Sequence, residues 1–70
     1  MARVEAHITG TVWRVEVAPG DHVDEGDTVV ILESMKMEMP VESEESGTVR
    51  AVLVTEGQAV SEGETVVELD

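Results

Sequence analysis

The sequence predicts a small all-β domain with an internal twofold repeat, built as a flattened sandwich or barrel. Valine dominates the apolar residues of the 70-residue chain, whereas phenylalanine and tyrosine are absent. β-Branched side chains suit a pleated sheet better than a helix, and no stretch of the chain keeps a helical period. A repeat in the sequence adds that two like halves bury their apolar faces against each other.

The repeat appears when the chain is shifted by 37 positions against itself. Residues 10–33 then align without a gap on residues 47–70, and thirteen of the twenty-four pairs are identical. Neither half is large enough to form a core alone. We therefore predict a single domain with halves of about 2–33 and 39–70, joined by a hairpin over residues 34–38.

Short strands and tight turns follow one another within each half. In the first half, valines alternate with charged residues over 14–17, the period of a half-buried strand. Pro19-Gly20 predicts a turn, because proline fixes φ at one central position and glycine accepts a positive φ at the next. A second turn is expected over 24–27 and a more apolar strand over 28–32. The second half repeats this scheme, which gives about four strands per half.

The composition excludes several classes of function. The net charge is −12, with sixteen acidic residues against four basic ones, which argues against nucleic acid and anionic membranes as partners. There is no cysteine, and His7 and His22 lack further ligands at a zinc-like spacing, so we expect no metal site. No apolar run is long enough to span a membrane. We expect a soluble, cytoplasmic and monomeric protein.

Some other residues are interpreted as structural. Trp13 aligns with Arg50 in the repeat, so we expect it to be a partly exposed packing residue, with contact to a partner as the alternative. The acidic residues Glu42, Glu44 and Glu45 are interpreted as a solvated face, with docking of a basic partner as the alternative.

Lys36 is the only lysine of the chain and the middle residue of the connector between the halves. Met35 and Met37 flank it, and large apolar side chains on an exposed tip are costly unless something uses them. Two interpretations stay open for this pair. The methionines either fold onto the end of the sandwich and stiffen the tip, or form a soft surface for a modifying enzyme.

The residues around Lys36 resemble the E-A-M-K-M-E signature of biotinyl domains, the carrier modules of biotin-dependent carboxylases. The glycine-containing segments at 10–13, 20–21, 26–27 and 47–49 are also placed as in that family. The resemblance covers essentially the whole chain, residues 1–70. The motif residues are Glu33, Ser34, Met35, Lys36, Met37 and Glu38.

The resemblance implies a barrel-like sandwich of two four-stranded antiparallel sheets, a barrel-sandwich hybrid. It also implies that a biotin protein ligase attaches biotin to Lys36, and that biotin carboxylase and carboxyltransferase components then use the carrier. Ser34 stands where alanine is usual, and the thumb insertion of some carriers is missing. The chain is most similar to the small free-standing biotin/lipoyl attachment proteins. No base neighbours Lys36 in sequence, so we expect a carrier that other enzymes load, and not an enzyme.

Two alternatives to a biotin carrier are retained. Lipoyl domains resemble biotinyl domains in the same duplicated fold, so the chain could carry lipoate or accept both groups. Lipoyl domains typically place aspartate before the lysine and alanine or valine after it, whereas Met35 and Met37 stand here. The second alternative is an unmodified acidic interaction module that keeps the fold, against which the intact lysine motif argues.

Overall fold

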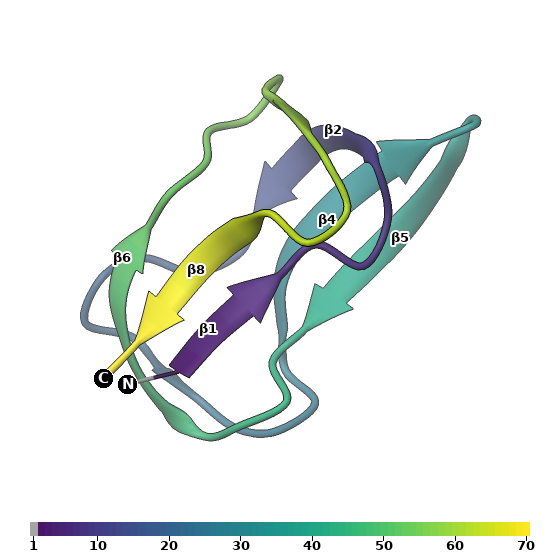
Figure 1. Ribbon diagram of the computed structural model, residues 1–70. Coiled ribbons are helices and arrows are strands. Elements are labelled where there is room, and N and C mark those ends of the chain that lie inside the picture. The colour runs from purple at the N-terminus through teal and green to yellow at the C-terminus, as the bar shows by residue number, and fades with distance from the viewer. Residues whose placement is uncertain (1) are drawn as a thin grey trace.

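Eight short strands form two antiparallel sheets that pack face to face in the computed structural model, which describes residues 2–70 (Figure 1). There is no helix within these residues, and the fold class predicted from the sequence is confirmed. The connection between the second and third strands is short and holds no thumb insertion. The strands are β1 (Ala2–Glu5), β2 (Gly10–Val15), β3 (His22–Val23), β4 (Thr28–Ser34), β5 (Met37–Glu42), β6 (Gly47–Val52), β7 (Ala59–Val60) and β8 (Thr65–Leu69).

The sequence repeat is reproduced in the topology of the sheets. Sheet I has the strand order β1-β8-β6-β3, and sheet II has the order β5-β4-β2-β7. The 37-residue shift places β1 on β5, β2 on β6, β3 on β7 and β4 on β8, so the two sheets have the same order. Each sheet takes two strands from each half, and neither half forms a sheet by itself.

The core consists of valine and leucine side chains from the inner faces of both sheets. Leu32 and Leu69, which are symmetry mates, are both fully buried. Val17 is only partly buried whereas its mate Val54 is buried, so the symmetry of the core is not perfect. Ala6 also belongs to this core, and five further pairs of mates are buried in it, namely Val4 and Val41, Val12 and Val49, Val23 and Val60, Val29 and Val66, and Val30 and Val67.

Four register shifts interrupt the pairing of the described strands, and two of them are β-bulges at equivalent positions in β2 and β6. Val12 pairs with Leu32 while Arg14 pairs with Ile31, so Trp13 is the extra residue in β2. Arg50 is the extra residue at the equivalent place in β6. A bulge lets two consecutive side chains face solvent, which explains why Trp13 and Arg14 are both exposed.

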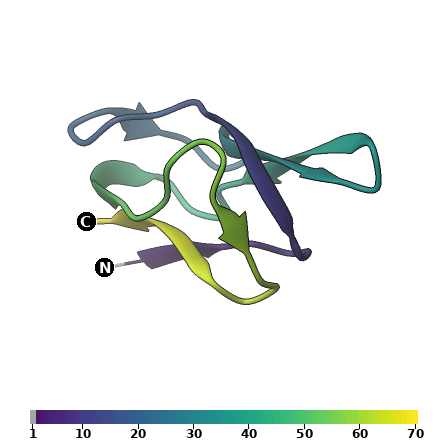
Figure 2. The same ribbon diagram turned by 90° about the horizontal axis from the view of Figure 1, so that it is seen from above.

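The hairpin of β4 and β5 projects from one end of the molecule (Figures 1 and 2). The described part of the chain measures 31 × 19 × 18 Å, and the start of β1 and the end of β8 lie together at the end opposite this hairpin (Figure 1). Ala2 pairs with Leu69, which holds the two ends of the chain side by side. Among residues 2–70, no helix has the length and apolar character needed to cross a membrane.

Candidate functional site

The projecting hairpin ends in a two-residue turn formed by Met35 and Lys36. Ser34 at the end of β4 pairs with Met37 at the start of β5, so the strands continue into the connector from both sides. Lys36 is therefore the second of two turn residues, and not the midpoint of a five-residue connector as the repeat suggested. The ladder of β4 and β5 fixes the base of this turn.

Both turn residues adopt the left-handed backbone conformation. The φ angles are +52° at Met35 and +66° at Lys36, and positive φ at both central positions is the mark of a type I′ hairpin turn. Such turns match the twist of the flanking strands but strongly prefer Asn-Gly. The sequence Ser-Met-Lys-Met has none of these turn residues, so this conformation could not be predicted from it.

The two methionines lie on the surface and do not cover the end of the sandwich. Met35 is 91% exposed and Met37 is 59% exposed, while Lys36 is also exposed. Because the Met35 side chain is almost fully exposed, it does not fold onto the end of the sandwich, and the interpretation that the pair stiffens the tip is wrong for Met35. The exposed apolar surface on both sides of Lys36 fits the second interpretation, a contact surface for another protein.

The base of the hairpin is held by a close approach of strand β2. A Cβ atom on Gly10 would lie 2.6 Å from the carbonyl oxygen of Glu33 and 3.5 Å from Cβ of Ser34. Only glycine therefore fits at position 10 without a shift of β4. Ser34 is half-buried against this glycine.

Two motif carboxylates face each other at the second residue pair below the turn. Glu33 pairs with Glu38 across the β4–β5 ladder, and both side chains are exposed. Like charges at directly opposed positions destabilise a sheet. Within residues 2–70 the amine of Lys36 has no ion pair or hydrogen bond, so it is presented free at the tip.

The other residues considered from the sequence lie apart from Lys36. Trp13 is 42% exposed, and the guanidinium carbon of Arg14 lies 5.6 Å from the centre of its ring. His22 Nε2 lies 3.0 Å from Oδ1 of Asp24, and both side chains are exposed. No group of three potential metal ligands occurs among the described residues.

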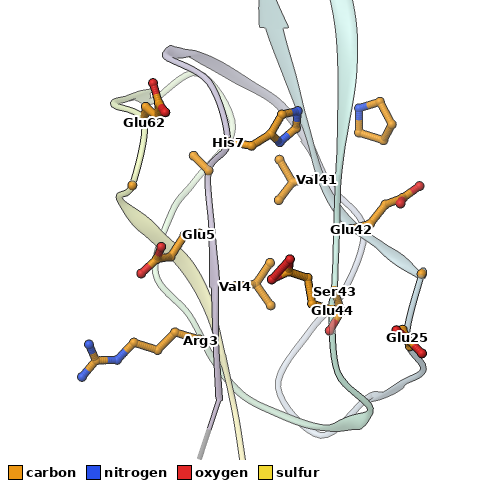
Figure 3. Close-up of a pocket in the computed structure, with 14 residues that line it drawn as sticks. Arg3, Val4, Glu5, His7, Glu25, Val41, Glu42, Ser43, Glu44 and Glu62 are labelled. Atoms are coloured by element: carbon orange, nitrogen blue, oxygen red, sulfur yellow. The ribbon is translucent and has the colours of Figure 1, made fainter.

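A groove of about 850 Å³ lies between strands β1 and β5, away from the hairpin tip (Figure 3). It is lined by symmetry mates, including Val4 with Val41 and Glu5 with Glu42. Glu42 and Glu44 lie along it, but residues 33–38 do not line it. The groove is lined by residues of both halves and is separate from the candidate attachment site.

Comparison with known proteins gives a consistent result. A family model described as biotin-requiring enzyme matches residues 2–69. Biotinylated protein TB7.3 of Mycobacterium tuberculosis is 58% identical over 38 residues, which are 54% of this chain and 54% of that protein. The biotin/lipoyl attachment protein of Bacillus subtilis is 47% identical over 38 residues, which are 54% of this chain and 52% of that protein. The aligned segments thus span about half the length of these curated relatives.

A solved structure extends the likeness to nearly the whole fold. The crystal structure of Kluyveromyces lactis urea carboxylase contains a region that superposes with a TM-score of 0.92 and 38% identity, over 99% of this chain and 6% of that one. The duplicated sheets, the lysine hairpin and the family match agree with the resemblance seen in the sequence. The chain belongs to the biotin/lipoyl family of biotin-requiring enzymes.

Proposed function

We propose that this chain is a biotin carrier, with biotin attached through an amide bond to Nζ of Lys36. The observation that carries the proposal is the free, exposed amine of the only lysine, at the tip of a projecting hairpin in a member of this family. The names of relatives such as biotinylated protein TB7.3 support biotin as the attached group.

The geometry suits a swinging arm. A carrier needs a long side chain with few contacts on a rigid base, so that the attached group can visit two active sites. The Lys36 side chain supplies the arm. The β4–β5 ladder and the close approach at Gly10 supply the base.

Loading requires a second protein. The amine nitrogen forms a bond to the carboxyl carbon of biotin, the bond from that carbon to its activating group breaks, and the amine loses a proton. No residue of the described chain is in place to accept that proton from Lys36. A biotin protein ligase is therefore the expected loading enzyme, and biotin carboxylase and carboxyltransferase components are the expected users. We assign the chain itself a carrier role without catalysis.

Intact-protein mass spectrometry after expression with a biotin protein ligase and a lipoate ligase tests the proposal. We expect one biotinyl addition on the wild-type chain and none on the Lys36→Arg variant, which keeps the positive charge. The variant should unfold at the same temperature as the unmodified wild type, because Lys36 makes no contact that the fold needs.

Each other result has a defined meaning. An unmodified wild-type chain would overturn the carrier role, and a lipoyl addition alone would replace biotin by lipoate. The name of the Bacillus subtilis relative, a biotin/lipoyl attachment protein, is the reason to supply both ligases. The cytoplasmic location and the monomeric state remain predictions.

A further inference from the structure

The two sheets share a core but differ on their outer faces. On sheet II, Arg14, Ile31 and Pro40 are directly paired across three strands, and Trp13 lies beside Arg14 at the bulge. We call these four residues the outer row. Trp13, Arg14 and Pro40 are exposed and Ile31 is half-buried, so the row presents apolar surface to solvent.

The symmetry mates of the outer row on sheet I are polar or small. Ile31 corresponds to Glu68, Pro40 to Arg3 and Trp13 to Arg50, while Arg14 corresponds to Ala51. On sheet I, Arg3 pairs with Glu68 and Glu68 pairs with Ala51, in the same register as on sheet II. The same backbone positions thus carry mainly charged residues on sheet I and mainly apolar residues on sheet II.

The internal symmetry distinguishes residues that the fold requires from residues that it does not. Symmetry mates occupy equivalent positions in equivalent sheets, so the structural requirements on the two residues of a pair are the same. The core obeys this, since Leu32 matches Leu69 and Val30 matches Val67. Because the fold accepts Glu68 and Arg50, it does not require Ile31 and Trp13 at the mates of those positions. An exposed tryptophan and its apolar neighbours indicate a contact surface, since tryptophan is enriched where partners bind.

The outer row lies on the outward face of sheet II, and its residues Ile31 and Pro40 belong to β4 and β5, the two strands of the lysine hairpin. Ile31 precedes Ser34 by three residues on β4, which is roughly 10 Å at the usual rise of a strand. A standard protein interface covers about 800 Å² on each partner, which is far more than a two-residue turn offers. An enzyme that receives Lys36 therefore extends beyond the tip onto one face of the hairpin.

The length of the side chain at position 36, before and after biotin is attached, indicates whether this enzyme loads the carrier or uses the loaded carrier. Before loading, the reacting nitrogen is only one lysine side chain away from the backbone of the turn. After loading, the biotinyl group lengthens the arm, and an enzyme can reach its ring from further away. The enzyme that holds the activated biotin, which the bare amine of Lys36 attacks, must therefore approach the sheet most closely.

We propose, on the basis of the biotin carrier function above, that the outer row of sheet II is the docking surface for the biotin protein ligase that loads Lys36. The charges around the row specify the chemistry of the ligase surface. Glu33, Glu38 and Glu42 are exposed and share the outward side of β4 and β5 with Ile31 and Pro40. The matching ligase surface has an apolar centre and a rim of lysine or arginine side chains.

The test exchanges residues between symmetry mates. Ile31→Glu and Trp13→Arg give sheet II the residues of sheet I, and Glu68→Ile and Arg50→Trp are the matched reciprocal variants. Loading of each variant by a purified biotin protein ligase, with biotin and ATP, is measured as kcat and KM for the carrier. We expect kcat/KM to fall about tenfold or more for the two sheet II variants, mainly through a higher KM, because a docking contact is lost while the chemistry is untouched. The sheet I variants should remain within about twofold of wild type, because they lie outside the docking surface.

Thermal unfolding of each variant accompanies the kinetics. Ile31→Thr is included because it keeps the β-branched shape, and it carries the test if Ile31→Glu does not fold. Unchanged kcat/KM in folded sheet II variants would overturn the docking surface while the carrier function stands. An equal fall in the sheet I variants would also overturn it. A wild-type chain that the ligase does not load would overturn the carrier function together with this inference.

Discussion

The lysine turn and the four glycine turns of this molecule all contain residues with positive φ angles, but the residue types differ. Gly20, Gly26, Gly57 and Gly63 have φ angles between +89° and +97°. Among residues 2–70, the only other positive φ angles belong to Met35 and Lys36. A left-handed conformation costs an L-residue roughly 1–2 kcal/mol, a cost that glycine avoids.

The glycine turns also occur as symmetry mates, and the lysine turn has none. Gly20 corresponds to Gly57 and Gly26 to Gly63, with backbone hydrogen bonds repeated at both places, such as Asp27 N to Asp24 O and Glu64 N to Ser61 O, each 3.0 Å. At the four turns that serve only the fold, glycine occurs in both halves. At the tip it retains two strained side chains, which indicates that Met35 and Lys36 are selected for what they present to other molecules.

The largest expected effect distinguishes two residues of the same hairpin, three positions apart. Leu32 is fully buried and Met35 is 91% exposed. Leu32→Ala should lower the free energy of unfolding by about 2–5 kcal/mol, because it leaves a cavity in the core. Met35→Ala should change it by less than about 0.5 kcal/mol, because its side chain contributes little to packing. Urea unfolding followed by circular dichroism measures both.

Leu69→Ala is the matched control for the buried position. It occupies the equivalent place in sheet I and should cost about as much as Leu32→Ala. A Met35→Ala variant as unstable as Leu32→Ala would show that the tip is part of the core and would remove the contrast between the two regions.

The glycine turns provide the second prediction. A Cβ atom on Gly26 or Gly63 would meet no other atom within 4 Å, so substitution there changes only the backbone energy. Gly26→Ala and Gly63→Ala should each lower the unfolding free energy by about 1–2 kcal/mol. Gly26→Asn should cost less, because asparagine tolerates positive φ better than alanine does. Equal stability of the alanine variant and wild type would mean that positive φ costs nothing in this fold.

Much of the fold could be predicted because the same sequence pattern occurs in both halves of the chain. The repeat and the alternation of valines gave the two sheets and their symmetry, and the glycine-containing segments gave the turns. The bulges were missed, although a signal was present. Val12 and Val15 both pack on the core yet are three residues apart, an odd spacing that a regular strand cannot direct to one face. Val49 and Val52 repeat this spacing in β6.

The residues of the candidate site could be predicted from the sequence, but the backbone conformation of the turn could not. Lys36 and its neighbours follow from the motif, because covalent attachment depends on residue type. The left-handed turn could not be predicted, because the tertiary fit of β4 and β5 overrides the local preferences of methionine and lysine. The close approach at Gly10 depends on which strands become neighbours, and a strand order is not written in a local pattern.

The smallest expected effect tests the turn itself. Met35→Asn places the residue that type I′ turns prefer at a position where φ is +52°. The unfolding free energy should rise by about 0.5–1 kcal/mol, because the strain of the methionine is relieved. Met37→Asn is the matched control, since Met37 lies in β5 without a positive φ and asparagine is unfavourable in strands. Urea unfolding should give a higher midpoint for the first variant and not for the second, with unchanged m values.

If Met35→Asn is more stable and yet is loaded more slowly by the ligase, stability and function oppose each other at this residue. A less stable Met35→Asn would contradict the strain that sets this turn apart from the glycine turns.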